Sequence, residues 1–411
     1  MLLNVVARQP LSKKSLRIFM ASTIILLALI FQGSPWLFNA AHSKPVQNAF
    51  YSATTEQKLS MPGTLLKIIA LKPPAFFRAK AWKILYNTRD TYGRPILSSG
   101  VVIVSDYAPR DPGKRKIVAW AHPTAGVNRA CAPSLQDWPG KSILGLNELI
   151  SAGYIVVATD YPGLGTIGPV GYLVGRGQGQ AVLDSVRAAE KIPGLSKAND
   201  VILWGYSQGG HAVQFASHLA GSYAAELNIL GMAAVAPPTD LTKLLAGNIN
   251  SVEGRIFTSF VLKSWSLKYG QDLTTIVNPA ALAGLNSISA ACVNNFGGQV
   301  EAYEAQKKLR PDFFYRNPLQ VSPWRELIRD NSLSSFTTAM PNFVFQGGND
   351  AVVRPEVTAV SVRNACRSGA VVKYVFQPKL GHGSSAKASI AVATAWIRDR
   401  FAGLPAPNNC K

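Results

Sequence analysis

The sequence predicts an α/β fold in which helices cover both faces of a mostly parallel β-sheet, with a mainly helical insertion. Short apolar runs suited to buried strands alternate with stretches in which apolar residues recur at helical spacing. The alternation stops after Pro237-Pro238 for about 100 residues and then resumes. Because strands of one sheet bracket this excursion, it predicts an insertion and not a separate terminal domain.

The elements before the insertion alternate regularly, and we predict residues 42–238 as the first part of the main domain. Two β-rich stretches come first, at 82–88 and 100–105. Buried strands are then predicted at 116–121, 154–159, 201–204 and 229–236, with helices at 142–152, 180–192 and 211–219. Strands and helices of these lengths predict a parallel sheet that is covered on both faces.

The insertion is predicted over residues 239–337. It carries apolar helical pieces around 241–245, 261–267 and 279–285. We interpret it as a helical cap or lid over the carboxyl ends of the strands, where ligands bind in sheets of this kind. The second part of the main domain is predicted over 338–411, with strands at 342–346 and 371–376 and helices at 356–367 and 385–401.

Residues 1–41 are predicted to form a signal peptide. Basic residues without any acid precede the apolar run Ile18–Phe31, and the small residues Ala40 and Ala41 permit cleavage. The alternative is an uncleaved membrane anchor, although the run is shorter than the ~20 residues of a full span. The protein is therefore predicted to be secreted or periplasmic.

The formal net charge of +20 does not indicate a nucleic-acid partner. A nucleic-acid-binding protein concentrates its charge on an arm or a stripe, whereas the basic residues here are scattered and never form a run of five. We interpret the charge as a solvated surface. It also favours peripheral contact with a lipid interface or an anionic cell envelope.

Four cysteines form an even set in a chain that is predicted to be exported. They indicate two disulfides with three alternative pairings, and none lies in a C-x-x-C pair that would suggest a zinc or redox site. The pairing that we expect first joins Cys366 to Cys410 and Cys131 to Cys292. Free buried thiols are the alternative.

The pentapeptide Gly205-Tyr206-Ser207-Gln208-Gly209 matches the pattern G-x-S-x-G. The pattern alone is weakly specific, but here it follows the predicted strand 201–204 and precedes a predicted helix, which is the setting of a nucleophile elbow. The glycines permit the sharp turn that lifts the serine hydroxyl above the sheet. Ser207 is therefore the candidate nucleophile, and the α/β-hydrolase fold is the predicted fold class.

A serine hydroxyl needs a base, and this fold requires the order serine, acid, histidine along the chain. Of the five histidines, two precede the serine and two lie on the helix directly after it, pointing away from the elbow. His382 remains as the candidate base. It lies in Gly381-His382-Gly383, where the glycines let a loop present the imidazole.

The candidate acid is Asp350, which follows the predicted strand 342–346 and precedes His382. An acid at this strand end fixes the tautomer of the imidazole and stabilises the imidazolium. Glu356 is the rival acid. Its place at the start of the next helix favours the role of a first-turn acid.

An oxyanion hole needs two N–H donors. Gln208, directly after the nucleophile, is one candidate. Thr124 is the other, in the loop after the predicted strand 116–121. Its neighbour Pro123 has no N–H and is excluded.

The segment Gly163–Gly168 matches the dinucleotide-binding pattern G-x-G-x-x-G and follows a strand. A pyrophosphate needs a helix that begins at the loop itself, but Pro169 and further glycines come first here. We interpret the segment as a glycine loop near the pocket. No cofactor and no metal are predicted.

One combination of segments is specific. It comprises Cys131–Ser134, Asp160–Gly165, Leu183–Ala189 and Gly205–Gly210. Together these segments resemble the secretory lipase family, the lipase A-like α/β hydrolases of fungi and bacteria, over roughly residues 75–405. The resemblance implies esterase or triacylglycerol lipase activity, a helical cap, no cofactor, and a triad of Ser207, Asp350 and His382. Pro123 departs from the glycine that the family leads us to expect.

The sequence thus predicts a secreted serine esterase or lipase that hydrolyses carboxylic esters of small molecules or lipids through an acyl-enzyme on Ser207. One alternative is an acyltransferase that uses the same triad. The other is a non-catalytic module that binds the cell envelope, against which the three filled triad positions argue. Acyl length and the natural substrate are not predicted.

Overall fold

A computed structural model of the protein describes residues 49–75, 77–106, 116–195, 200–309 and 313–410. Within these residues, nine strands form one sheet in the order β1-β2-β3-β5-β4-β6-β7-β8-β9. The strands are β1 (Leu65–Leu71), β2 (Ala79–Arg89), β3 (Pro95–Ser105), β4 (Ile117–Ala121), β5 (Ile155–Thr159), β6 (Asp200–Tyr206), β7 (Asn228–Val235), β8 (Asn342–Gly347) and β9 (Val372–Gln377).

The sheet is mostly parallel, as the sequence predicts. Six neighbouring strands run parallel to one another, in the order β5, β4, β6, β7, β8 and β9. At the other side of the sheet, β1, β2 and β3 form antiparallel pairs. Every residue of β4, β5 and β8 is buried, which explains why each contains a short apolar run, IVAWA, IVVA and FVF. The edge strand β1 was not predicted, because it is half-exposed or exposed along its length and its sequence LLKIIAL does not alternate.

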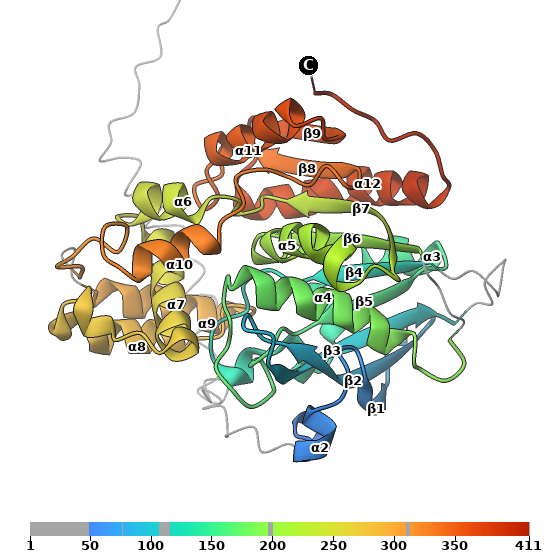
Figure 1. Ribbon diagram of the computed structural model, residues 1–411, viewed down its shortest axis with the longest axis horizontal. Helices are drawn as coiled ribbons and strands as arrows, with labels where there is room; N and C mark the ends of the chain where they lie inside the picture. Colours follow the sequence, from blue (N-terminus) through green and yellow to red (C-terminus); the bar gives the residue numbers. More distant parts are fainter. Residues whose placement is uncertain (1–48, 76, 107–115, 196–199, 310–312, 411) are drawn as a thin grey trace, which may run out of the picture. The chain divides into compact units, whose positions relative to one another are not determined.

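Helices cover both faces of this sheet (Figure 1). On one face, α4 (Gly175–Ala189) and α5 (Gln208–Tyr223) bury their apolar sides in a cluster with β4 and β6. On the other face, α3 (Leu146–Ser151) and α12 (His382–Phe401) pack in a second cluster around Trp120 and Trp204. A further helix, α11 (Pro355–Arg367), packs against β8 and β9.

Between β7 and β8 the chain forms helices instead of strands. These are α6 (Leu241–Asn248), α7 (Val252–Tyr269), α8 (Leu282–Ala290), α9 (Phe296–Lys307) and α10 (Trp324–Asp330), which we call the helical segment. The segment has a buried cluster of its own around Phe260, Trp265 and Trp324. In Figure 1 its helices lie together beside one end of the sheet.

Four helices begin at positions other than those predicted. Helix α4 begins at Gly175 and not at residue 180, and α5 begins at Gln208 and not at residue 211, because glycines near both starts weaken the helical signal in the sequence. Helix α3 begins at Leu146 and not at residue 142, because Gly145 directly before it adopts a left-handed φ of +72°. Helix α12 begins at His382 and not at residue 385. The N–H of Gly381 donates to the hydroxyl of Ser384 (2.9 Å), a local bond that starts the helix where the sequence predicts a glycine loop.

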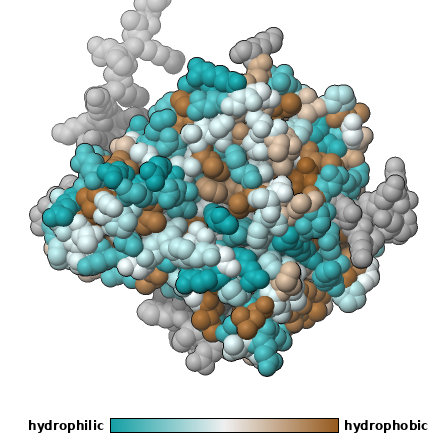
Figure 2. Space-filling view, viewed as in Figure 1, coloured by the Kyte–Doolittle hydropathy of each residue, from teal (hydrophilic) through white to brown (hydrophobic). Residues whose placement is uncertain are grey.

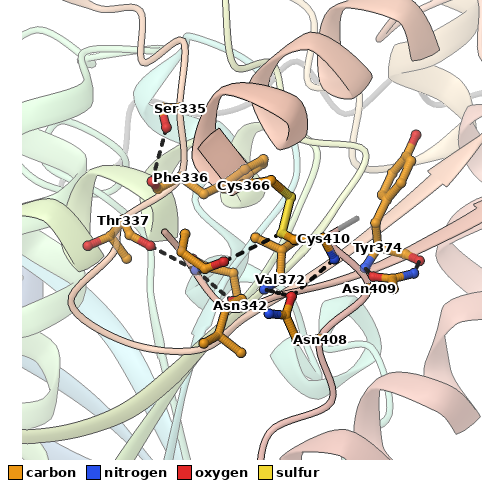
Figure 3. Close-up of a disulfide and its surroundings, with 12 residues drawn as sticks. Ser335, Phe336, Thr337, Asn342, Cys366, Val372, Tyr374, Asn408, Asn409 and Cys410 are labelled. Carbon is orange, nitrogen blue, oxygen red and sulfur yellow. Dashed lines mark hydrogen bonds between the residues drawn. A yellow bond between two sulfur atoms is a disulfide. The ribbon is translucent and has the colours of Figure 1, made fainter. Parts of the chain in front are cut away.

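Both disulfides form with the predicted pairing, which is thereby confirmed. Cys131 is bonded to Cys292, with their Cα atoms 5.1 Å apart. This bond joins the loop that follows β4 to the chain between α8 and α9. Cys366 of α11 is bonded to Cys410 of the C-terminal tail, with a Cα–Cα distance of 5.2 Å (Figure 3).

The C-terminal tail pairs with the edge strand β9 (Figure 3). The side-chain oxygen of Asn408 accepts a hydrogen bond from the N–H of Val372 (3.2 Å), and that of Asn409 accepts one from the N–H of Tyr374 (2.7 Å). The tail therefore satisfies backbone donors that an edge strand would otherwise present to another chain.

The surface is mixed in character. On the face shown in Figure 2, hydrophilic and hydrophobic residues alternate in small patches over the described part of the molecule. None of the described helices is both long and apolar enough to cross a membrane. The predicted signal peptide, residues 1–41, lies outside the described residues.

We expect the disulfide of the tail to contribute strongly to stability. Replacing Cys366 and Cys410 together by Ala opens a loop of sequence separation 44. The unfolded chain then regains entropy that corresponds to about 4 kcal/mol in the chain-entropy model. The free energy of unfolding in urea, measured for both proteins at neutral pH, tests this. A loss below about 1 kcal/mol would contradict the expectation.

Candidate active site

Ser207 lies at the sharp turn between β6 and α5. Its backbone angles are φ +53° and ψ −120°, a strained conformation for a residue with a side chain. A Cβ atom added to Gly209 would lie 1.8 Å from the carbonyl oxygen of Ala121, and one added to Gly205 would lie 2.2 Å from that of Gly209. Because no side chain fits in such a space, the turn requires both glycines of the pentapeptide.

His382 contacts Ser207 from the first turn of α12. Its Nε2 is 2.9 Å from the hydroxyl oxygen of Ser207. The tyrosine of the pentapeptide holds the histidine in place, because the Tyr206 hydroxyl donates to the carbonyl oxygen of His382 (3.1 Å) and the two rings are 5.0 Å apart. The imidazole is thus presented by a helix end and not by the glycine loop that the sequence suggests.

Asp350 lies directly beyond the end of β8 and is buried. Its Oδ2 is 2.8 Å from Nδ1 of His382. The other carboxylate oxygen accepts hydrogen bonds from the backbone N–H groups of Val352 (2.9 Å) and Val353 (2.8 Å). The amide of Gln346 donates to Oδ2 (3.2 Å), so the carboxylate is fixed from three sides. Sequence reasoning missed this contribution of Gln346.

The rival acid lies away from the site. Glu356 is in the first turn of α11, and its side chain is 65% exposed beside Arg354. The structure thus brings Ser207, His382 and Asp350 together and leaves Glu356 outside.

The two candidate oxyanion donors lie next to Ser207. Gln208 is the first residue of α5, so the helix offers its N–H no partner. Thr124 lines the cavities that contain Ser207, and its hydroxyl is 3.1 Å from that of Tyr172.

A buried histidine holds the loop that carries Thr124. Nδ1 of His122 lies 2.6 Å from the carbonyl oxygen of Pro123, and Nε2 lies 3.1 Å from that of Asp160. Burial lowers the pKa of His122, and both of its ring nitrogens lie within hydrogen-bond distance of a backbone carbonyl oxygen. The Tyr161 hydroxyl donates to the carbonyl oxygen of His122 (3.1 Å).

The carboxyl group of Asp160 belongs to the same buried network. It accepts hydrogen bonds from the N–H of Ser134 (2.9 Å) and the hydroxyl of Ser99 (2.6 Å). Burial raises the pKa of Asp160 more than these bonds lower it. Asp160 lies directly after β5, and this place at the end of a strand is the kind of sequence signal that also indicates Asp350 after β8.

Two cavities meet at Ser207. The first, which we call the apolar cavity, spans about 710 Å³, part of it open to solvent, and is lined mainly by the helical segment, including Leu241, Leu244, Val261, Trp265 and Ile328. The second cavity spans about 1120 Å³, part of it open to solvent, and its mostly apolar lining includes the polar residues His122, Ser142, Glu253, Asn294, Gln299 and His382. Ser207, Thr124 and Phe257 line both.

Asn331 connects the helical segment to the helices of the sheet. Its carbonyl oxygen accepts a hydrogen bond from Nε2 of His211 on α5 (2.8 Å). Its side chain accepts from the N–H of Gly175 on α4 (2.8 Å) and donates to the hydroxyl of Tyr269 on α7 (3.0 Å). Burial lowers the pKa of His211 from 6.5 to about 4, so the ring is neutral near pH 7.

A mostly parallel sheet with a serine elbow after one inner strand, and with His and Asp side chains at neighbouring strand ends, defines the class of α/β hydrolases. The chain belongs to the secretory lipase family, whose model matches residues 141–409. This membership confirms the predicted family and fold, and also the predicted enzyme class, a carboxylic ester hydrolase. The family's name describes secreted enzymes.

Among its relatives, Lipase 6 of Candida albicans is 28% identical over 95% of this chain and 88% of its own length. The secreted triacylglycerol lipase LIP1 of Malassezia furfur is 24% identical over 95% of this chain and 82% of its own length. The chain therefore spans most of both relatives.

Two solved structures share the fold. Candida antarctica lipase A in its closed state has a TM-score of 0.78 at 20% identity, with 90% of each chain covered. A rice cell wall degrading esterase, LipA from Xanthomonas oryzae, has a TM-score of 0.67 at 20% identity, covering 84% of this chain and 99% of its own. At this identity the likeness shows the fold.

The neutral state of His211 predicts a pH-dependent stability. Its folded pKa lies below the unfolded value, so the unfolded chain binds more protons between pH 6.5 and 4. The stabilisation that neutral His211 gives to the folded state is complete above pH 6.5. It falls by about 3 kcal/mol in all as the pH drops toward 4. Urea unfolding of the wild type and of His211→Gln, from pH 7 to pH 4, should give a flatter dependence for the variant.

His218→Gln is the matched control, because His218 is exposed on the same helix. If the free energy of unfolding depends on pH in the same way for the wild type, His211→Gln and His218→Gln, protonation of the buried His211 does not cause the loss of stability at low pH.

Proposed function

We propose that this protein hydrolyses acyl esters through an acyl-enzyme on Ser207, with His382 as general base and Asp350 as the acid that orients it. One observation carries the proposal. The two ring nitrogens of His382 lie 2.9 Å from the Ser207 hydroxyl and 2.8 Å from the Asp350 carboxylate, which are the contacts that activation of a serine requires.

The first half of the reaction forms the acyl-enzyme. The Ser207 oxygen bonds to the carbonyl carbon of the ester, and the serine proton moves to Nε2 of His382. The N–H groups of Gln208 and Thr124 stabilise the charge that develops on the carbonyl oxygen. When the bond to the alcohol oxygen breaks, the proton moves from Nε2 to that oxygen and the alcohol leaves.

The second half releases the acid. Water bonds to the acyl carbon while Nε2 of His382 takes one of its protons, and this proton then returns to the Ser207 oxygen as the acyl bond breaks. The Asp350 carboxylate stabilises the imidazolium in both halves, and its bonds from Val352 and Val353 keep it in line with Nδ1.

We propose that residues 239–337 form a cap whose helices build an acyl-binding wall. The support is the apolar cavity, since Leu244 and Val261 of the helical segment line it together with Ser207. Leu262, which is buried within the segment, and Phe314, which packs half-buried against the same cluster, do not line the cavity.

We also propose that residues 1–41 direct export and are removed. The support is the basic stretch followed by the apolar run Ile18–Phe31, together with the family's secretory name.

Ser207→Ala should abolish nearly all hydrolysis of p-nitrophenyl butyrate while the protein stays folded, because the triad acts as a unit. A fluorophosphonate probe should label the wild type at Ser207 and leave the variant unlabelled. Peptide mapping and circular dichroism check both points. Full activity in the variant, or labelling at another residue, would overturn the assignment of the nucleophile.

The cap proposal predicts an acyl-length profile. Each methylene buried in the apolar cavity contributes about 0.8 kcal/mol, so kcat/KM should rise about fourfold per methylene until the cavity is full. Val261→Phe narrows the cavity and should lower the ratio of kcat/KM for long esters to that for short ones.

The matched control is Leu267→Phe on the same helix, since Leu267 is exposed and does not line the cavity. An unchanged profile in Val261→Phe, with stability retained, would show that the cap does not bind the acyl chain.

A further inference from the structure

The side chain of Thr124 lies in the wall of both cavities, beside the proposed nucleophile. It lines the apolar cavity together with Ser207 and Gln208, and it also lines the second cavity. Its loop lies against the elbow, because a Cβ atom added to Gly209 would lie 3.0 Å from the carbonyl oxygen of His122, two residues before Thr124. The side chain is therefore close to the place where the carbonyl oxygen of a bound ester becomes charged.

The hydroxyl of Thr124 is paired with that of Tyr172. The two oxygens are 3.1 Å apart, and within the described residues neither hydroxyl has a second hydrogen-bond partner. A phenol is a stronger acid than an aliphatic alcohol, so Tyr172 is the better donor of the two. Burial raises the pKa of Tyr172 above its usual value, so this donor keeps its proton near neutral pH. The proton of Thr124 is then free to be donated into the cavity.

Helix α7 of the helical segment fixes Tyr172. The N–H of Tyr172 donates to the hydroxyl of Ser264 (2.9 Å), and its carbonyl oxygen accepts from Nε1 of Trp265 (2.8 Å). Its ring packs edge to face on Phe260, with the ring centroids 5.9 Å apart. Because these three contacts come from one helix, they fix the phenol hydroxyl and, through it, the orientation of the Thr124 side chain.

A hydroxyl that is held in this way suits a developing oxyanion. Donors that are in place before the reaction stabilise the charge without having to reorganise. A hydroxyl that accepts a hydrogen bond is polarised by it and becomes a better donor itself. The neighbouring Pro123 offers no N–H, so a side-chain hydroxyl adds a donor to a part of the loop that has lost one.

We propose that the Thr124 hydroxyl is a third donor of the oxyanion hole, beside the N–H groups of Gln208 and Thr124, and that Tyr172 positions it. The phenol donates to Oγ1 of Thr124, and Oγ1 donates its own proton to the oxyanion. The inference rests on the proposed acyl-enzyme function, because it concerns the tetrahedral intermediate on Ser207. Thr124 is then a catalytic residue through its side chain, and Tyr172 is a positioning residue that makes the oxyanion hole depend on α7.

Two substitutions separate the hydroxyl of Thr124 from the shape of its side chain. Thr124→Val keeps the shape and the backbone N–H, so kcat for p-nitrophenyl butyrate should fall about 100-fold while KM changes less than about twofold. Thr124→Ser keeps the hydroxyl, so kcat should stay within about threefold of the wild type. An unchanged kcat in Thr124→Val, or an equal loss in both variants, would overturn the proposal.

A boronic acid distinguishes a catalytic hydroxyl from a structural one. Butylboronic acid forms a tetrahedral, negatively charged adduct with a catalytic serine and so resembles the intermediate. Its inhibition constant should rise in Thr124→Val by about the factor by which kcat/KM falls, because both report binding of the charged oxygen. An inhibition constant that stays at the wild-type value while kcat falls would overturn the proposal.

Tyr172→Phe tests the positioning role. Alone, it should lower kcat about fivefold through the loss of one hydrogen bond, and weaken boronate binding equally. In the Thr124→Val background the same change should lower kcat less than about twofold, because the hydroxyl that Tyr172 positions is gone. Losses that multiply in the double variant would overturn the role of Tyr172. If Thr124→Val does not fold, unchanged kcat and boronate binding in Tyr172→Phe would overturn the proposal.

Thr394→Val is the matched control. Thr394 is a half-buried threonine of α12 that lines neither cavity, and its hydroxyl donates to the carbonyl oxygen of Ile390 in its own helix (2.8 Å). Its kcat and inhibition constant should equal those of the wild type. A loss as large as that in Thr124→Val would show that the effect is not specific to the oxyanion hole, and would overturn the proposal.

Ser207→Ala separates the two levels of the argument. Hydrolysis that survives in this variant would overturn the acyl-enzyme function together with the inference. Loss of hydrolysis in Ser207→Ala, with a Thr124→Val variant as active as the wild type, would overturn the inference alone.

Discussion

The close approach of the elbow to the neighbouring strand is the constraint on which the rest of the site depends. At Gly209 the helix α5 touches the end of β4 so closely that even a methyl group would clash with Ala121. Two residues before this contact, Ser207 has a strained backbone, of a kind that costs about 1–3 kcal/mol, and the bond from its N–H to the carbonyl oxygen of Val235 (2.8 Å) helps to hold it. The turn places the hydroxyl at the strand ends, beside the side chains of Asp350 and His382 that we propose as acid and base.

The walls of the cavities need to be fixed relative to this hydroxyl, and the helical segment is tied down at several points. Asn331 bonds to both α4 and α5. Trp265 of α7 donates to the carbonyl oxygen of Tyr172 (2.8 Å), and Ser264 accepts from the N–H of the same residue (2.9 Å). The Cys131–Cys292 disulfide holds the start of α9 against the loop after β4. These bonds join the segment to α4, α5 and two separate loops, so they fix its helices against the rest of the molecule.

The parts of this molecule whose structure is determined by residues close together in the chain were predictable from the sequence. The buried strands are apolar runs because both of their faces are covered, and the elbow follows from glycines that the backbone requires. The edge strand β1 was not predicted, because an exposed strand lacks the pattern of apolar residues that burial imposes on a sequence. The start of α12 escaped prediction because a hydrogen bond from Gly381 to Ser384, and not propensity, extends the helix to His382. The support that Gln346 gives to Asp350 depends on packing between β8 and α11, which no spacing along the chain reveals.

The loop after β4 explains how this chain accommodates Pro123 where its family suggests glycine. A glycine there would leave the backbone free to adjust, whereas proline fixes φ and removes one donor. The His122 ring bonds to the Pro123 carbonyl oxygen, and Tyr161 bonds to that of His122. The loop is thus fixed through contacts to its carbonyl oxygens. Thr124, which follows Pro123, carries the next N–H along the chain. Burial lowers the pKa of His122 and raises that of Asp160, so it disfavours the charged form of both groups beneath the loop that carries the proposed oxyanion donor Thr124.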